Sequence, residues 1–516
     1  MTDCPSKLLL FVKDFTGRGA DCFYWFENGQ LNETSAEQIV SFSGMVVCHD
    51  FWIIRDVLFD KTQDLPKIIV DLDEFRMAIS GNPTDRLSRE KMDITGELSR
   101  YGASTEVCSA YKKMFYRGVK FDAEVACEAA KAMTEMYSSL CAEALANGEL
   151  ERLFTVELPV YRLLQKAMSA GISINSTGLS EKRRESEHDY FFCLKNYSAT
   201  HDMPLETPTR ETIEARLYEA GFDLSGVSTD YAMEFLPHED DFGNDTLALL
   251  ELDSTKRVLS SLTISSGRTR PIIDAFGSRT SRVHLRSPSL QNMAKKYRTI
   301  VTPREGAELC YVDFDQYEVG IMAALSGDLE LASLYGAGDM YDLFATTHLG
   351  LEGSRKAAKQ LFLSYAYGMS PKALIDAAVS LGADRVRAKA AFRIFSKYEE
   401  WKKSVWTTFQ REGCIGTVQG NHYKRGGQGH LSAKEQRSAV SQVIQGTASL
   451  IFKKALLEVS DLEDVTIILP MHDALLFEYR LAETPAKVVA AFEKVMTEHL
   501  HGRVNGKASI GQFAPN

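Results

Sequence analysis

The sequence lacks several features that would place it in a specialised class of protein. It has no apolar run of about 18 or more residues, so we expect no membrane-spanning helix and no membrane partner. Its nine cysteines are scattered and odd in number, without a Cys-x-x-Cys pair, which argues against a disulfide framework or a zinc site. The start of the chain has a short apolar stretch but neither a basic leader nor a small-residue cleavage site. These absences favour a cytoplasmic protein with reduced thiols, and we interpret the apolar stretch as a first strand.

Size and composition leave room for two or three domains. The chain has 516 residues, and domains usually hold roughly 100–200 residues each. Hydrophobic residues make up 44% and charged residues 25%, which is ordinary for a soluble globular protein. The net charge of −11 disfavours a nucleic-acid partner, but segment 268–305 holds seven Arg and two Lys against one Asp and one Glu. Such a basic strip can neutralise phosphates, because distant acids are screened beyond about 10 Å. A solvated charged loop is the alternative interpretation.

The N-terminal part of the chain alternates strand-like and helix-like segments. Short β-branched or apolar runs predict strands at residues 8–12, 45–48 and 68–72. A pattern rich in Ala, Glu, Met and Lys predicts a helix over residues 122–145. These alternating segments indicate an α/β domain at the N-terminus.

The rest of the chain is mostly helical in pattern, with two strand-containing segments. Residues 309–325 begin as a strand and continue as a helix, and residues 354–381 form a helix–turn–helix in which Ser370 and Pro371 suit a cap and a first helical position. Two apolar runs flanking a polar tip predict a hairpin. The remaining expected elements are helices over most of residues 155–265, helices at 384–412 and 432–459, and hairpin strands at 465–469 and 475–479.

Two acidic residues lie where predicted strands end. Asp313 follows an apolar strand, and His472-Asp473 forms the tip of the hairpin. Each acid taken alone is more often a turn or cap residue. Two carboxylates aimed outward from adjacent strands, however, could hold two Mg²⁺ ions about 3.5–4 Å apart, which suits the transfer of a nucleotide to a 3′-hydroxyl.

A third group of residues lies on one helical face. Arg355, Lys359, Leu363 and Tyr367 follow one another at a spacing of four, which places them on the same side of a helix. The cationic end offers charge-assisted donors to phosphate, and the aromatic end can stack near a base. An amphipathic helix with a solvated basic edge is the alternative. Together with the two acids, the face has the layout of a nucleotidyl transferase.

At these residues the chain resembles the family A DNA polymerases, the group of bacterial Pol I and phage T7-like enzymes. The resemblance spans about residues 155–516 and consists of five blocks in the family's order. The blocks are TSRVHLRSPSLQNM (280–293), VDFDQYEVGIMAALSGD (312–328, motif A), RKAAKQLFLSYAYGMS (355–370, motif B), RSAVSQVIQGTA (437–448) and MHDALLFE (471–478, motif C).

The resemblance implies a template-directed DNA polymerase with a role for each matching residue. Asp313 and Asp473 would hold two Mg²⁺ ions, with Mn²⁺ as a substitute, and Lys359 would protonate the leaving pyrophosphate. Glu318 would be the steric gate against a ribose 2′-hydroxyl. The implied nucleotide-binding residues are Arg355, Lys359, Glu318, Tyr367, Leu363, Tyr341, Gln316 and Arg298. The implied contacts to primer–template DNA, whose minor groove presents acceptors shared by all correct pairs, are Arg282, Arg437, Gln445, His472, Gln291 and Asn292.

The sequence departs from the family pattern at several of these positions. Ala474 stands where motif C usually has Glu, so we expect a weakened metal site. Leu363 replaces an aromatic residue that contacts the sugar, Tyr341 a His that contacts the triphosphate, and Gly320 an Arg that follows motif A. These departures favour a divergent phage enzyme, acting in the host cytoplasm.

The N-terminal segments resemble the 3′–5′ exonuclease domain of the same family, with the catalytic acids degraded. The matching segments are 11–19, 44–56 and 65–82. Such a domain needs four carboxylates, but Asp14 has no Glu two residues on, and Ile54 or Arg55 stands near the next expected acid. Gly118–Asp122 is the nearest match to the Tyr-x-x-x-Asp motif. We therefore expect a folded exonuclease-like domain without nuclease activity.

The expected fold class is mixed α/β and α+β. An RNase H-like exonuclease-type domain (1–150) would precede a right-hand polymerase (151–516), with antiparallel palm strands backed by helices. The polymerase would divide into a thumb (about 151–270), palm (about 271–345 and 436–516) and fingers (about 346–435). Two alternatives are a single-subunit RNA polymerase, which shares the layout, and a catalytically silent DNA-binding scaffold of a replisome. A processivity factor stays unidentified among the partners.

Overall fold

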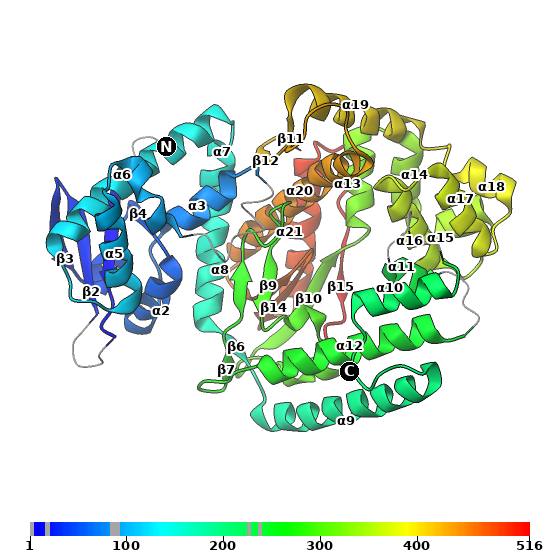
Figure 1. The fold of residues 1–516 in the computed structure, drawn as a ribbon, viewed down its shortest axis with the longest axis horizontal. Coiled ribbons are helices and arrows are strands. Elements are labelled where there is room, and N and C mark those ends of the chain that lie inside the picture. The colour runs from blue at the N-terminus through cyan, green and yellow to red at the C-terminus, as the bar shows by residue number, and fades with distance from the viewer. Residues whose placement is uncertain are drawn as a thin grey trace. The chain divides into compact units, whose positions relative to one another are not determined.

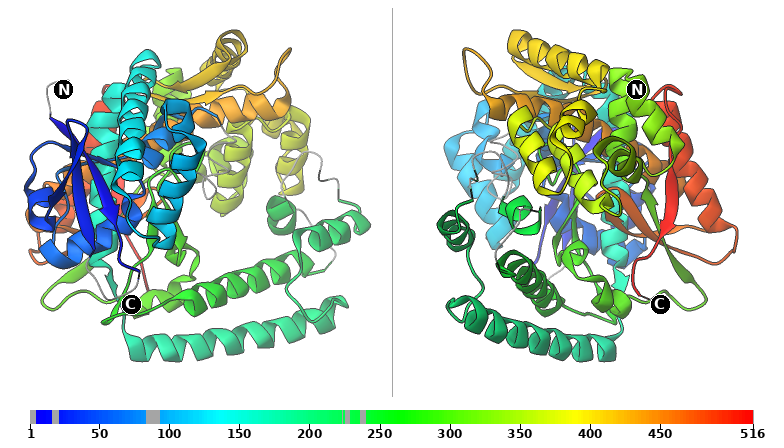
Figure 2. Two further views of the ribbon diagram at one scale, coloured as in Figure 1. Left: turned by 60° about the vertical axis from the view of Figure 1, so that its left-hand side comes forward. Right: turned by 90° about the vertical axis from the view of Figure 1, so that its right-hand side faces the viewer.

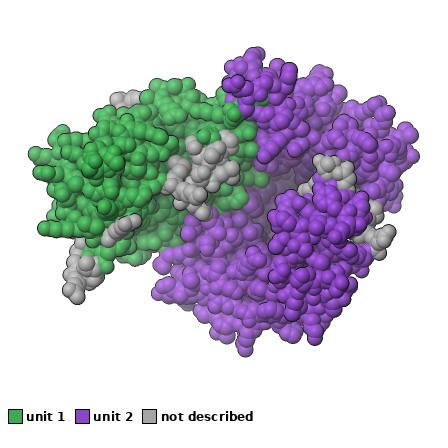
Figure 3. All heavy atoms as spheres, viewed as in Figure 1, with its two compact units in different colours: residues 1–170, 273–284, 414–426 green, residues 171–272, 285–413, 427–516 purple. Residues whose placement is uncertain are grey.

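The computed structural model describes residues 5–15, 21–82, 93–222, 224, 229–235 and 240–515, without the side chains of Arg117, Tyr231 and Phe235. Residues 16–19 of the first exonuclease-like segment lie outside the described part. The chain divides into two compact units (Figure 3). Unit 1 comprises residues 1–170, 273–284 and 414–426, and unit 2 comprises residues 171–272, 285–413 and 427–516.

Unit 1 contains a five-stranded sheet in the order β3-β2-β1-β4-β5. Strands β1 (Ser6–Val12), β2 (Cys22–Glu27) and β3 (Gln30–Thr34) pair antiparallel, whereas β4 (Met45–Cys48) and β5 (Ile68–Asp71) continue the sheet in parallel. Residues 8–11 of β1 and all of β4 are apolar and buried, as expected of strands covered on both faces. The expected strands at 8–12 and 45–48 are confirmed, and the one at 68–72 ends at Asp71 because Leu72 begins a helix.

The hairpin β2–β3 was not anticipated, although its sequence carries a strong local signal. Glu27 pairs with Gln30, so Asn28 and Gly29 form a two-residue turn with φ values of 50° and 77°. Asn-Gly is the preferred pair for a turn that needs positive φ at both central positions. In β2 the side chains of Phe23 and Trp25 are buried and alternate with more exposed neighbours.

Helices surround this sheet in unit 1 (Figure 1). The expected helix at 122–145 is confirmed as α6, which Asp122 caps by accepting hydrogen bonds from the backbone N–H groups of Glu124 and Val125. The helices of this unit are α1 (Ala36–Ser41), α2 (Phe51–Thr62), α3 (Leu72–Ile79), α5 (Thr105–Arg117), α6 (Ala123–Ala146), α7 (Leu150–Arg152) and α8 (Leu158–Ala170).

Two later segments of the chain fold into unit 1 and meet around a buried ion network. The hairpin β11 (Cys414–Thr417)–β12 (Gly420–Lys424) places Asn421 and His422 against Glu149. Asn421 also donates to the carbonyl of Thr280 and accepts from the hydroxyl of Ser281, so residues 273–284 share the same network. Unit 1 is therefore assembled from three separate stretches of sequence.

Unit 2 is built on a four-stranded antiparallel sheet in the order β13-β14-β10-β15. The strands are β10 (Glu308–Phe314), β13 (Thr466–Met471), β14 (Ala474–Tyr479) and β15 (Ala508–Gly511). Helix α21 (Thr484–His499) packs on β10 and β15, and the long buried helix α20 (Ala433–Ser460) packs on α21. The expected antiparallel strands backed by helices, and the hairpin around His472-Asp473, are confirmed.

The expected helices of unit 2 are also found, with one correction. Arg355–Ala366 (α16) and Pro371–Ser380 (α17) form the predicted helix–turn–helix, with Ser370 as the cap of α17. The stretch 384–412 is instead two helices, because the chain turns at residues 392–395, where Phe392 and Phe395 insert into a cluster of aromatic rings. These two helices are α18 (Arg385–Ala391) and α19 (Ser396–Glu412).

The helices at 176–261 form a separate layer of unit 2, in which α9 and α12 lie side by side (Figures 1 and 2). Nowhere in the described part of the chain is a helix long and apolar enough to cross a membrane. The remaining helices and short strands of unit 2 are β6 (Ile172–Ser173), α9 (Ser176–His201), α10 (Arg210–Glu219), α11 (Thr229–Phe235), α12 (Phe242–Ser261), β7 (Arg268–Thr269), α13 (Tyr317–Ser326), α14 (Leu329–Ala337) and α15 (Met340–Leu343). Strands β8 (Ile272–Asp274) and β9 (His284–Ser287) lie where the chain passes between the units.

Candidate active site

The two predicted metal carboxylates lie at the same end of the unit 2 sheet. Strand β10 pairs with β14 so that Asp313 is directly opposite Ala474. The turn before β14 consists of His472, with φ of 58°, and Asp473, whose carbonyl accepts a hydrogen bond from the backbone N–H of Phe314 at 3.4 Å. The sheet therefore brings together two acids from segments far apart in the sequence.

Asp313 is held in a state that disfavours its negative charge. Its Oδ1 atom is buried and has no hydrogen-bond partner. Burial, followed by the charges of Asp473 and Asp315, raises the pKa of Asp313 to about 7, and Lys359 opposes this rise. A buried carboxylate oxygen that lacks a hydrogen-bond donor is suited to bind a cation, since hard divalent ions prefer oxygen ligands.

This carboxylate pair is a small ligand set. Within the described ranges, no group of three or more His, Cys, Asp and Glu side chains is arranged to hold a metal ion. Ala474, opposite Asp313, is buried and supplies no ligand where the family pattern has Glu. Any ion at this end of the sheet would thus depend on Asp313 and Asp473.

The predicted helical face is confirmed as one side of α16. Arg355 and Lys359 lie within 5.8 Å of the ring of Tyr341, Arg355 through its guanidinium carbon and Lys359 through its Nζ atom. Tyr341 is itself buried, so both cations lie beside a buried aromatic ring. At the C-terminal end of the helix, the N–H of Tyr367 donates to the carbonyl of Leu363. Two cations one helical turn apart can offer charge-assisted donors to more than one phosphate group.

The two residues expected to check the sugar and the base contact one another. The hydroxyl of Tyr367 donates a hydrogen bond of 2.6 Å to Oε2 of Glu318, in the first turn of α13. The contact joins the start of α13, just beyond β10, to the end of α16. The side chains expected to face the sugar and the templating base are therefore joined by a direct hydrogen bond.

Gly320 replaces the Arg of the family pattern for a steric reason visible in the structure. A Cβ atom at this position would lie 2.6 Å from Cε of Met496 and 2.8 Å from Cζ of Tyr335. Glycine, which has no Cβ, permits such a close approach. Helix α13 therefore packs against α14 and α21 at a position where an Arg side chain has no room.

Three predicted residues occupy the loop between β9 and β10. Gln291 uses its amide to bond the N–H and the carbonyl of Leu285, and Arg298 donates to the carbonyls of Met293 and Gln291. Burial lowers the pKa of Arg298. Asn292 lies next to Gln291 in the short 3-10 helix Leu290–Asn292. Gln291 and Arg298 thus fix the shape of this loop, and their expected contacts with nucleotide or DNA stay predictions.

The other predicted DNA-binding residues are distributed over both units. Arg437 lines a cavity of about 780 Å³ together with Gly368 and Trp406, and Gln445 lies two turns further along α20. His472 is the first turn residue beside Asp473. Arg282 belongs to unit 1, where its backbone N–H bonds the hydroxyl of Ser278.

Two acidic neighbours of the candidate site were missed by sequence reasoning. Asp339 pairs with Arg355, and Asp315 adds its charge to the Asp313 site while accepting a hydrogen bond from Ser509 at 2.8 Å. The Asp339-Met340-Tyr341 stretch carried a detectable signal, because an Asp before a short helix is a typical N-cap. Its pairing with Arg355 had no local signal.

The acids of unit 1 are largely engaged in internal structure. Asp71 is fully buried and accepts hydrogen bonds from the N–H groups of Phe51 and Asp73 and from the hydroxyl of Tyr161. Asp73 accepts from the N–H groups of Asp50 and Ile94, and burial raises its pKa to about 7. These carboxylates connect β5 to the segments around it.

Aromatic side chains lie beside these acids. The ring of Phe115 lies 4.1 Å from that of His49, which shares a 2.9 Å hydrogen bond with the hydroxyl of Tyr111. Tyr111 and Phe115 are one turn apart on α5, so this helix carries a Tyr-x-x-x-Phe pattern.

Arg55 of α2 donates from Nη1 to the side chain of Gln165 and from Nε to Asp56. Its charge is thereby directed at helix α8 of the same unit. The expectation that Arg55 opposes a metal ion stays a prediction.

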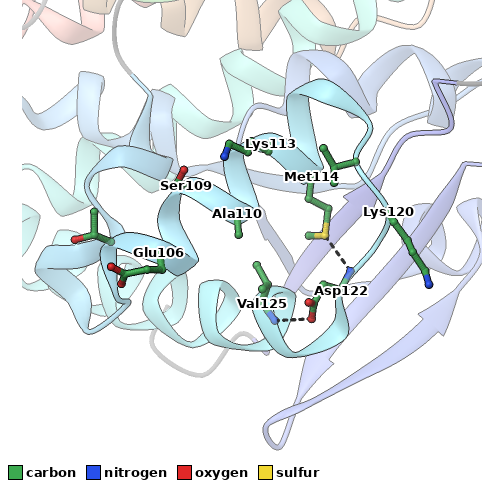
Figure 4. A pocket seen from close by; sticks show the side chains of 10 residues that line it. Glu106, Ser109, Ala110, Lys113, Met114, Lys120, Asp122 and Val125 are labelled. Atoms are coloured by element: carbon green, nitrogen blue, oxygen red, sulfur yellow. Dashed lines mark hydrogen bonds between the residues drawn. The ribbon is translucent and has the colours of Figure 1, made fainter.

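Asp122 also lies in the floor of a pocket of about 550 Å³ between α5 and the start of α6 (Figure 4). The N–H of Asp122 donates to the sulfur of Met114, and its carboxylate accepts from Val125. Lys113 and Lys120 extend from two different sides of this pocket. Asp122, at the nearest match to the expected Tyr-x-x-x-Asp motif, is thus a helix cap, and the expected loss of exonuclease activity stays a prediction.

Comparison with known proteins places this arrangement in a family. The sequence profile of DNA polymerase family A matches residues 245–512, which include both carboxylates and the whole of α16. The chain belongs to DNA polymerase family A. Membership places Asp313, Asp473 and the α16 face inside the matched region.

Individual members of family A are similar at low identity. DNA polymerase I of Mycobacterium tuberculosis is 25% identical over 395 residues, which cover 68% of this chain and 43% of that protein. DNA polymerase theta of Caenorhabditis elegans is 30% identical over 212 residues, covering 39% of this chain and 13% of that protein. The thermostable DNA polymerase I of Thermus aquaticus is 26% identical over 257 residues, covering 46% and 31%. The chain thus matches less than half the length of each of these relatives.

A solved structure shares the fold over nearly the whole chain. The POL domain of Pol1 from M. smegmatis, solved in complex with DNA primer-template and dNTP, covers 98% of this chain and 94% of its own, with a TM-score of 0.73 and 20% identity. The chain therefore has the mixed helix and strand fold of a Pol I polymerase domain.

Proposed function

We propose that this protein is a template-directed DNA polymerase that adds dNTPs to a primer 3′-hydroxyl. The observation that carries the proposal is the buried, unpartnered Oδ1 of Asp313 beside Asp473, with Lys359 within electrostatic range. Membership of family A supports it, since the similar proteins are named as DNA polymerases. The solved relative holds DNA primer-template and dNTP, and we propose the same partners here.

Asp313 and Asp473 are the residues that would hold two Mg²⁺ ions, with Mn²⁺ as a substitute. Their oxygen donors and the raised pKa of Asp313 fit divalent cations, because a nearby cation would favour the ionised carboxylate. When bound, such ions supply an activated hydroxyl and neutralise phosphate charge. The missing third carboxylate at Ala474 predicts weaker binding of the ions than the full ligand set would give.

The chain's own side chains would position the reactants. Arg355 and Lys359 would bind the triphosphate, with Lys359 donating a proton to the leaving pyrophosphate. Glu318 would exclude a 2′-hydroxyl. Tyr367, which donates a hydrogen bond to Glu318, would lie beside the templating base. Catalysis would then come mainly from orientation and charge stabilisation.

Primer extension on a defined template tests the proposal. Wild-type protein with Mg²⁺ and dNTPs should extend the primer, and Asp313→Asn should lose at least about a hundredfold in rate, as removal of a charge-stabilising group in an active site does. Asp461→Asn, an exposed acid at the end of α20, is the matched control and should retain activity. A folded wild-type protein that binds primer–template but never extends it would refute the proposal in favour of a silent scaffold.

We also propose that the N-terminal unit is an RNase H-like exonuclease-type fold without nuclease activity. Its order of antiparallel β3-β2-β1 followed by parallel β4 and β5 supports the fold. The sequence lacks a Glu two residues after Asp14 and has Arg55 near the next expected acid, which supports the loss of activity. Degradation of single-stranded DNA by the purified protein, abolished by Asp14→Ala, would contradict this proposal.

The right-hand arrangement is part of the same proposal. The exonuclease-like domain would occupy residues 1–150, with the thumb at about 151–270, the palm at about 271–345 and 436–516, and the fingers at about 346–435. The buried sheet carrying Asp313 supports the palm, and α16 with its cationic face supports the fingers. A phage source, and with it the host cytoplasm, stays a prediction from the divergent residues.

A further inference from the structure

Of the two cationic side chains expected to bind the triphosphate, Arg355 already has an anionic partner in the protein itself. Nε of Arg355 donates to Oδ2 of Asp339 at 2.7 Å, and its Nη2 lies 2.6 Å from the same oxygen. Lys359, one turn further along α16, forms no ion pair with the side chains that the structure describes. The two cations on the same helical face are therefore unequal: Arg355 is paired with a carboxylate and Lys359 is not.

Asp339 is held in place by contacts that do not involve Arg355. Its Oδ1 accepts hydrogen bonds from the N–H groups of Tyr341 and Asp342, both at 3.0 Å, and so caps α15. The side-chain amide of Gln316 donates to the carbonyl of Gly338 and accepts from the N–H of Met340. The loop that carries Asp339 is thereby fixed to a residue just beyond strand β10.

The carboxylate is a chemical match for a phosphate oxygen at this position. Arg355 presents adjacent N–H groups to a single oxygen of Asp339, a contact that an anionic phosphate oxygen can equally accept. The side chains of both partners are partly exposed, at 53% for Arg355 and 37% for Asp339, so an incoming anion can reach the pair. Against the cost of partial burial, the Arg355 hydrogen bond lowers the pKa of Asp339, so this carboxylate is charged at neutral pH.

We propose that Asp339 is a positioning residue that competes with the nucleotide triphosphate for Arg355. The inference rests on the proposed polymerase function, in which Arg355 binds the triphosphate. In the ligand-free protein Asp339 holds the guanidinium over Tyr341, and a polyphosphate must displace this carboxylate before it engages Arg355 and Lys359 together. Asp339 thus weakens binding of the triphosphate and of the pyrophosphate product alike.

The competition predicts a specific change when the charge of Asp339 is removed. Asn still accepts the two backbone hydrogen bonds of the cap, so Asp339→Asn removes the charge and keeps the helix start. A partly exposed Arg–Asp pair of this kind is weak, so its loss should tighten binding of a polyphosphate by about two- to fivefold. Arg355→Ala should weaken binding, and adding Asp339→Asn to it should produce no further gain, because the two residues act through one contact.

Binding of inorganic tripolyphosphate to the full chain, measured by isothermal titration calorimetry without metal or DNA, is the direct test. Asp342→Asn is the matched control, because it removes the same charge from the same short helix at a residue without a side-chain ion pair in the described structure. Asp339→Glu keeps the charge and should bind like the wild type. If the gain arose from a loosened cap, Glu would show it as well.

The expected result is tighter binding by Asp339→Asn alone. Equal, weaker or undetectable binding by that variant would overturn the proposal, as would an equal gain in Asp342→Asn or a gain that persists when Arg355 is already Ala. In primer extension, KM for dNTP should fall by the same factor while kcat does not rise. A wild-type protein that extends no primer would refute the polymerase function, whereas the tripolyphosphate titrations would still decide the role of Asp339.

Discussion

Replacing Glu149 by Gln should destabilise unit 1 strongly. Glu149 is 1% exposed and forms an ion pair with Arg152, which is equally buried and also pairs with Glu157. The carboxylate of Glu149 accepts hydrogen bonds from the N–H groups of Asn421 and His422 and from the ring of His422. An amide keeps one acceptor oxygen and introduces N–H donors that would face donors, so several of these hydrogen bonds cannot form.

The expected loss is about 3 kcal/mol in the free energy of unfolding. Against the cost of burial, the hydrogen bond from His422 and the charge of Arg152 lower the pKa of Glu149 to about 2, from an ordinary value of about 4.3. That difference corresponds to about 3 kcal/mol of preference for the ionised form, at roughly 1.4 kcal/mol per pKa unit. Breaking a buried ion pair by removing one partner costs about 3–5 kcal/mol, which agrees.

The pH dependence has a defined sign. Because the pKa of Glu149 is lower in the folded than in the unfolded protein, its stabilisation is fully present above about pH 4.3 and is lost as the pH falls towards 2. The part of the difference between wild type and Glu149→Gln that comes from the titration of Glu149 itself should therefore be unchanged from pH 8 to pH 5. It should narrow only below about pH 4.3.

Urea unfolding followed by circular dichroism measures the stability, and amide hydrogen exchange of peptides within residues 414–426 locates the effect. Exchange in this hairpin should accelerate in Glu149→Gln. Glu151→Gln is the matched control, because Glu151 is an exposed acid on the same short helix. A loss below about 1 kcal/mol, a similar loss in Glu151→Gln, or a difference that grows as the pH falls below about 4.3 would refute the reasoning.

Three further predictions concern other positions. Gly320→Ala should cost about 1 kcal/mol or more in urea unfolding, because the added Cβ would clash with Tyr335, whereas Gly336→Ala on α14, which has open space, should stabilise by up to about 1 kcal/mol; equal effects of the two would contradict the packing argument. Tyr161→Phe should lower the free energy of unfolding by about 1–3 kcal/mol, because it removes a hydroxyl donor to the fully buried Asp71, and an unchanged urea midpoint would disprove it. Glu318→Ala should raise ribonucleotide incorporation in primer extension, and an unchanged ratio of dNTP to rNTP use would remove its assignment as the steric gate.

Local sequence patterns determined most of the secondary structure around the site. The apolar run before Asp313 and the two runs flanking His472-Asp473 were sufficient to predict strands with an acid at the end of each. The spacing of Arg355 and Lys359 was sufficient to place both on one helical face, because the α-helical period depends only on neighbours in the sequence. The Asn28-Gly29 turn carried a comparable local signal for a hairpin, although we did not predict it.

Tertiary structure decided how distant segments meet. Only the register of β10 with β14 places Asp313 opposite Ala474 and leaves a carboxylate oxygen buried without a donor. Asp339 pairs with Arg355, and Glu149 accepts from Asn421. In both cases the local sequence pattern of one segment does not indicate its contact with the other.

The physical reason is the range of the interactions involved. Helix and strand propensities, caps and turns act over a few residues, so they can be derived from the order of amino acids. Burial, the loss of water around a carboxylate and the resulting rise in the pKa of Asp313 arise only when the whole fold surrounds the group. The sequence by itself therefore determined which residues could form the site, and the tertiary structure decided which of them are paired, which are buried and which are available to a ligand.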